Sequence, residues 1–249
     1  MDKGWQVLRL SDDSRYLIER VVDDFEKNLG CGLYDYREED DQKHLETTLE
    51  LQGVFGAYGR RIIEGSLDQF RDLAGQDLHI QKYPYLRIAR PGKPQDNIGI
   101  HRDTLYGSTP YEISVVIPLT SMPAEGSLHV IDGSQSQPAS SYPFEAIETD
   151  VVKNSGKHNL GFVYLKKKLA ANLPTHPVLV KVGECLAFPL SLVHGQEVNR
   201  ASWPRFSVDI RLVNSLADIE WERTVHKDYW EPLCVCPVTR EARAYYAAQ

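Results

Sequence analysis

Residues 97–119, NIGIHRDTLYGSTPYEISVVIPL, carry the pattern on which the fold and the chemistry of this chain depend. His101 and Asp103 are one residue apart in a segment, 98–103, that we expect to be a short strand. Successive side chains of a strand alternate in direction, so His101 and Asp103 should share a face while Arg102 points away. A neutral imidazole and a carboxylate are two ligands for a divalent metal. One further histidine would complete the 2-His-1-carboxylate triad that leaves open positions on Fe(II).

The spacing alone is weak evidence, because His226 and Asp228 repeat it near the end of the chain. That second pair follows the last clear strand pattern, and no histidine or anion-binding pattern lies downstream of it. We therefore interpret the pair at 226–228 as coincidental.

A candidate third ligand, His194, lies at the end of the apolar segment 188–194. Eleven residues later, Arg205 opens a segment, 205–213, in which polar and apolar residues alternate, and Ser207 shares its face. A guanidinium binds a carboxylate through two parallel hydrogen bonds, and a neighbouring hydroxyl can add a third. The order of these residues therefore suggests a metal site followed by a clamp for a dicarboxylate co-substrate.

This arrangement resembles the Fe(II)/2-oxoglutarate-dependent oxygenases, most closely the phytanoyl-CoA dioxygenase-like branch found in bacterial natural-product biosynthesis. Residues 126–134, GSLHVIDGS, are similar to a turn of that branch, and Asn199 also matches. Three residues in or beside the turn depart from the pattern of the branch: Glu125, Asp132 and Gln135. The resemblance covers roughly residues 80–213.

The resemblance implies a double-stranded β-helix, a jelly-roll or cupin-like barrel, with iron held by His101, Asp103 and His194. It also implies that 2-oxoglutarate binds iron through its keto-acid end and Arg205, helped by Ser207, through its far carboxylate. O2 would be the second co-substrate, with succinate and CO2 as co-products. Because the carboxylate ligand is present, the expected reaction is hydroxylation of a small-molecule metabolite, or a desaturation or ring closure.

Other interpretations stay open at this point. A cupin-like isomerase or a metal-binding module would need the histidines but not the clamp. Arg87 is a further candidate for binding the co-substrate, and a solvated surface arginine is the alternative. Arg211 shares the face of Arg205 and is expected to pair with Asp209, with a substrate contact as the alternative. Tyr106 and Trp203 are candidates for lining the mouth of the site.

The remaining sequence predicts one mostly β domain with flanking helices, over residues 1–249. Helical periodicity over 12–29 and about 44–73 predicts support helices within 1–78, with Gly53, Gly56 and Gly65 as possible bends or breaks in the second pattern. Short strand patterns predict a β core over 79–213, among them 80–89, 112–119, 127–131, 178–182 and 185–188. Residues 132–175 are interpreted as an insertion and 214–249 as a C-terminal cap.

Composition narrows the function classes. The net charge of −7 argues against a nucleic acid partner, because phosphate binding needs a basic surface. No apolar run is long enough for a transmembrane helix, and the N-terminus lacks a signal peptide pattern. The four irregularly spaced cysteines favour a reduced, cytoplasmic protein. The substrate class beyond a small molecule and the oligomeric state are not predicted.

Overall fold

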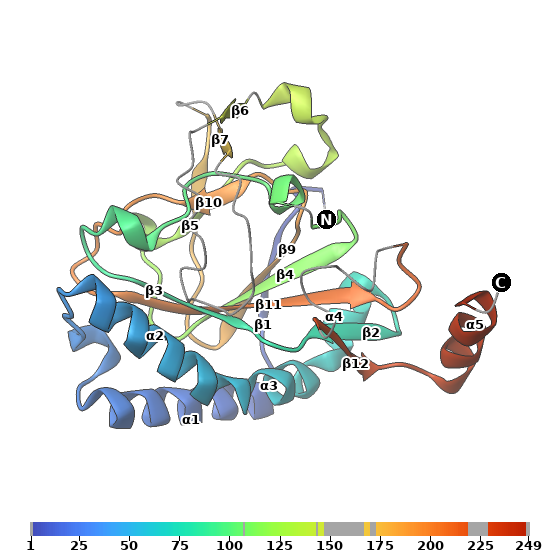
Figure 1. Cartoon of the computed structure of the whole chain (residues 1–249), viewed down its shortest axis with the longest axis horizontal. Helices are drawn as coiled ribbons and strands as arrows, with labels where there is room; N and C mark the ends of the chain where they lie inside the picture. The colour runs from blue at the N-terminus through green and yellow to red at the C-terminus, as the bar shows by residue number, and fades with distance from the viewer. Residues whose placement is uncertain are drawn as a thin grey trace.

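Two antiparallel sheets and a layer of helices build the part of the chain that the computed structural model describes: residues 2–106, 108–142, 144–146, 167–169, 173–218 and 229–247. The helices cover one face of the larger sheet, and the smaller sheet lies on its other side (Figure 1). The larger sheet therefore has two buried faces.

The larger sheet has its strands in the order β1 (Gln6–Arg9), β9 (Glu184–Pro189), β4 (Glu112–Pro118), β11 (Arg205–Asn214), β2 (Leu78–Gln81) and β12 (Trp230–Cys234), and β3 (Tyr85–Ala89) also pairs with β11. The smaller sheet has the order β10 (His194–Gln196), β5 (Leu128–Val130) and β8 (His176–Val178). A separate pair joins β6 (Phe144–Ala146) to β7 (Lys167–Leu169). The site described below lies between the two main sheets.

Strand β11 shows how the sequence creates both faces. All its residues from Arg205 to Val213 are buried, yet they alternate in polarity. The apolar residues pack in the cluster beneath the helices: Phe206, Val208, Ile210 and Leu212. The polar residues lie on the opposite face: Arg205, Ser207, Asp209 and Arg211. Four buried polar side chains in one row indicate a functional surface, because such groups need partners inside the protein.

The helical layer consists of α1 (Asp12–Leu29), α2 (Asp41–Gly56), α3 (Gly59–Gly65) and α4 (Leu67–Ala74), and α5 (Pro237–Ala247) lies at the C-terminal end. Ser11 caps the first turn of α1 by accepting from the backbone N–H of Ser14, and Gly30 ends the helix with φ of 69°. This confirms the helix expected over 12–29. Buried apolar residues of α1, α2, α3 and α4 form one cluster with the face of the larger sheet that these helices cover.

Several predicted elements are wrong in detail. The helical pattern over 44–73 is three helices, and two of the expected breaks are confirmed, because α2 ends at Gly56 and α3 at Gly65. The strand expected over 80–89 is two strands, and Pro84, which has no N–H to donate, lies between them. The segment 98–103 is not a strand. His194 begins β10 rather than ending the preceding strand.

The prediction of a mostly β protein with flanking helices is confirmed, with one correction to its shape. In the described segments the two main sheets face each other without joining into a closed barrel. Most of the insertion predicted over 132–175 lies outside the described residues. None of the described helices combines the length and hydrophobicity needed to cross a bilayer.

Candidate metal and co-substrate site

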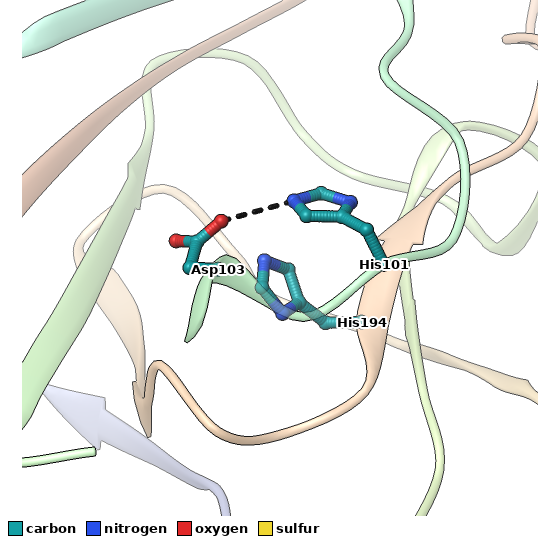
Figure 2. Close-up of side chains that lie close together, drawn as sticks. All are labelled: His101, Asp103 and His194. Atoms are coloured by element: carbon teal, nitrogen blue, oxygen red, sulfur yellow. Dashed lines mark hydrogen bonds and ion pairs between the residues drawn. The ribbon is translucent and has the colours of Figure 1, made fainter. Parts of the chain in front are cut away.

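Three side chains from two segments converge between the sheets. His101 and His194 form an isolated β-bridge, in which the N–H of His101 donates to the carbonyl of His194 (2.7 Å) and the reverse bond measures 2.9 Å. Asp103 opens a short 3₁₀ turn, Asp103–Tyr106, two residues after the bridge. The potential ligand atoms of the three buried residues all lie within 4.8 Å of one another, around a common space (Figure 2).

The same residues therefore meet for a different reason from the one expected. His101 and Asp103 do not share the face of a strand. The β-bridge to His194 holds His101, and the 3₁₀ turn that begins at Asp103 directs its carboxylate toward His101. Arg102 does point away, as predicted, and donates to the backbone carbonyls of Ser134 and Gln137.

Backbone carbonyls fix the tautomers of both imidazoles. Nδ1 of His101 lies 2.8 Å from the carbonyl oxygen of Gly99, and Nδ1 of His194 lies 2.9 Å from that of Leu192. A carbonyl oxygen can only accept, so each Nδ1 carries a proton, and Nε2 is the ring nitrogen left to bind a metal. Burial, and next the charge of His101, lower the pKa of His194 to about 4, which keeps this ring neutral at pH 7.

The carboxylate of Asp103 has a different partner for each oxygen. Oδ1 lies 3.1 Å from Nε2 of His101, and Oδ2 accepts from Nη2 of Arg211 at 2.9 Å. Burial alone would raise the pKa of Asp103, but the Arg211 guanidinium and the neighbouring imidazoles hold it well below its ordinary range. The pairing expected between Arg211 and Asp209 is wrong, because Arg211 reaches across to the metal-site turn instead.

Arg205 is a buried cation at the start of β11. Its Nη1 donates to the carbonyl of Gly126 at 3.1 Å, its Nη2 donates to Oε1 of Gln196, and its Nε has no hydrogen-bond partner. Among the described residues it forms no ion pair with a carboxylate. Burial, and next the charge of Arg87, lower the pKa of Arg205 to about 9, so it stays charged at pH 7.

Asn199 holds the loop between β10 and β11 against the end of β3. Its Nδ2 donates to the carbonyls of Ala89 (2.8 Å) and Trp203 (2.9 Å), and its Oδ1 accepts from the N–H of Ala201 (3.0 Å). These bonds tie the loop to the end of β3 immediately before Arg205.

A pocket opens onto this site. Its polar lining includes Arg87, Ser207, Gln196 and Asp209, in addition to the three potential ligands. Its apolar lining consists of Ile98, Val116, Leu128 and Phe188. Ser207 is the register partner of Arg87, which is why both reach the same cavity. Arg205 lies behind Gln196 and does not itself line the pocket.

Two polar residues that line the pocket, Asp209 and Gln196, were not predicted from the sequence. Asp209 accepts from the hydroxyl of Ser114 at 2.5 Å and pairs with Nη2 of Arg87 at 3.5 Å. Its position two residues after Ser207 in an alternating strand was a signal that could have placed it. Gln196 had no comparable signal, because its role depends on a contact across the fold.

Of the two residues expected at the mouth of the site, only Trp203 can be placed, and it lies outside the pocket. Trp203 packs edge-on against Tyr34, with ring centroids 5.9 Å apart, and does not line the pocket. The side chain of Tyr106 and the pair His226–Asp228 lie outside what the structure describes.

Comparisons with known proteins now identify the family. The family model "Phytanoyl-CoA dioxygenase (PhyH)" matches residues 33–207, which include all the residues predicted for the site. This chain belongs to the phytanoyl-CoA dioxygenase family. It is therefore an enzyme of the iron- and 2-oxoglutarate-dependent dioxygenase class, which uses O2 as its second co-substrate. No curated protein sequence matches the chain.

Solved structures agree on the fold of this phytanoyl-CoA dioxygenase family member. The non-haem monooxygenase ThoJ in its apo form is 18% identical, with 94% of this chain and 82% of that chain covered and a TM-score of 0.62. EvdO2 from Micromonospora carbonacea var. aurantiaca is 16% identical, with coverages of 86% and 87% and a TM-score of 0.53. The epimerase SnoN, in complex with Fe3+, alpha ketoglutarate and nogalamycin RO, is 14% identical, with coverages of 86% and 80% and a TM-score of 0.50. At these identities the likeness establishes the double-stranded β-helix fold alone.

Proposed function

We propose that this protein is an Fe(II)- and 2-oxoglutarate-dependent oxygenase that hydroxylates a small-molecule metabolite, with iron held by His101, Asp103 and His194. The observation that carries the proposal is the convergence of the three side chains, whose potential ligand atoms all lie within 4.8 Å of one another in a buried space. Two imidazoles and one carboxylate gathered in this way match the 2-His-1-carboxylate set that binds Fe(II).

The donor set suits iron rather than a harder or softer metal. Two imidazole nitrogens and one carboxylate oxygen are the facial set of non-haem Fe(II) oxygenases. The hydrogen bonds from each Nδ1 to a carbonyl are the outer contacts that orient metal-binding histidines. When bound, iron with 2-oxoglutarate and O2 supplies the oxidising power for cleavage of a substrate C–H bond, with succinate and CO2 as co-products.

We assign the binding of 2-oxoglutarate to two arginine side chains, Arg205 and Arg87. Arg205 is a buried guanidinium that pairs with no carboxylate among the described residues, which is costly unless a ligand provides one. We assign it the far carboxylate of 2-oxoglutarate, which would replace Oε1 of Gln196 as the acceptor for Nη2, with the hydroxyl of Ser207 as a second donor. Arg87 lines the same pocket and adds positive charge beside Ser207.

The pocket favours a small substrate. Its apolar side chains, Val116, Leu128 and Phe188, exclude water from the reacting atoms, while the Arg87–Asp209 pair offers polar contacts. Hydroxylation is favoured because Asp103 keeps the carboxylate ligand in place; desaturation or ring closure would start from the same C–H cleavage. The similar structures include a monooxygenase and an epimerase, so the outcome depends on how the substrate sits.

The test is a spectroscopic titration of metal-free protein with Fe(II) and 2-oxoglutarate without oxygen. We expect a weak visible metal-to-ligand charge-transfer band that His101→Ala and Asp103→Ala abolish. Arg205→Met should weaken 2-oxoglutarate binding and leave Fe(II) binding intact. His176→Ala, which removes an exposed histidine outside the cluster, is the matched control and should keep the band. Bound iron without the band in the wild type would overturn the proposal.

A further inference from the structure

Arg211 is the one arginine of the β11 row whose guanidinium contacts a proposed iron ligand among the described residues. Its Nη2 donates to Oδ2 of Asp103 at 2.9 Å, and both side chains are about nine-tenths buried. The two residues are 108 positions apart in the sequence, so only the fold brings them together.

Other contacts hold the guanidinium in place. Its Nη1 donates to the hydroxyl of Ser108 at 2.9 Å and lies 3.8 Å from Oε2 of Glu112. The ring of Tyr85 lies 6.0 Å from its Cζ. A planar fork fixed on two sides in this way presents its remaining donors in a single orientation, which an ammonium group could not do.

The geometry divides the two oxygens of Asp103 between two tasks. Oδ2 is occupied by Arg211, while Oδ1 faces the space shared with His101 and His194. A carboxylate held through one oxygen cannot rotate to offer both, so it should bind a metal through Oδ1 alone. This leaves the coordination positions that the co-substrates require.

We propose that Arg211 is a positioning residue that holds Asp103 as a one-oxygen ligand, an inference that rests on the proposed iron site. It does not contact the reacting atoms; it acts through Asp103. The residue class is specific, because lysine would keep the charge and lose the fork.

The experiment measures metal binding rather than turnover, using Arg211→Met and Arg211→Lys. Each variant is titrated with Co(II), a spectroscopic substitute for Fe(II), and both the Kd and the visible absorption of the bound ion are recorded. Loss of an outer partner of a metal ligand weakens affinity by about 10- to 100-fold. We expect that loss in Arg211→Met, together with an altered Co(II) spectrum, and a smaller loss in Arg211→Lys.

Arg90→Met is the matched control. It removes a buried guanidinium that pairs with Asp96 and Asp41, away from the three ligands, and should lower stability without changing the Co(II) spectrum. Unchanged Kd and spectrum in Arg211→Met would overturn the inference; if that variant fails to fold, unchanged values in Arg211→Lys would do so. Failure of wild-type protein to bind Co(II) through His101 would instead refute the iron site itself.

Discussion

Gly195, in β10, lies against the backbone of Gly99 and Ile100, and its replacement by alanine tests the geometry of the whole site. An added Cβ would lie 2.1 Å from the carbonyl oxygen of Gly99 and 2.6 Å from Cα of Ile100. Both atoms belong to the backbone, so no side chain can move aside. Ordinary van der Waals contact begins at 3.4 Å, so the two segments must separate by about 1.3 Å.

That separation breaks the bridge between His101 and His194. Overpacking costs about 1–3 kcal/mol, and each of the two backbone hydrogen bonds at risk contributes about 0.5–1.5 kcal/mol. We expect the free energy of unfolding to fall by about 2–6 kcal/mol, which lowers Tm by roughly 4–24 °C in a chain of this length. A displacement of His101 by about 1.3 Å far exceeds the tolerance of about 0.2 Å in metal–ligand distances, so metal affinity should fall more than about 100-fold.

Thermal unfolding and a Co(II) titration of Gly195→Ala measure the two effects separately. Gly53→Ala is the control, because that glycine is exposed in α2 with no atom near its added Cβ. It should raise stability by about 0.5–1 kcal/mol through helix propensity and leave metal binding unchanged. A Gly195→Ala protein with wild-type Tm and wild-type Co(II) affinity would refute the close approach of the two segments.

Two further predictions concern charge. Gln196→Glu places a carboxylate against Arg205, so 2-oxoglutarate affinity should fall at least about tenfold while Fe(II) affinity holds; an unchanged 2-oxoglutarate titration would count against the assigned clamp. Burial lowers the pKa of His79 and of His194 to about 4, so between pH 6.5 and 4 the unfolded chain binds protons that the folded chain does not. The metal-free protein should therefore lose stability as pH falls through that window, and His79→Gln should remove about one proton from the slope in urea unfolding. A pH-independent wild-type stability there would contradict this assignment.

The sequence predicted much of the fold because local patterns and burial agree. The alternation over 205–213 predicted a strand with one apolar and one polar face, and β11 has both. The helical period over 12–29, stopped by Gly30, predicted α1 within its observed bounds. The prediction failed where the chain changes direction within an apolar run, as at Pro84, because periodicity reports buried faces and says little about where an element ends.

By itself, the sequence determined which chemical groups this protein brings to a site. His101, Asp103, His194 and Arg205 could be singled out from residue type, order and spacing, since the chemistry of a metal and an anion needs those groups. The tertiary structure alone decided how they act. It paired Arg211 with Asp103 and not with Asp209, because contacts between segments far apart in sequence depend on how the fold places each segment and on the direction of each side chain. It also placed Gly195 against Gly99, a close approach between two backbones that no pattern along one chain can encode.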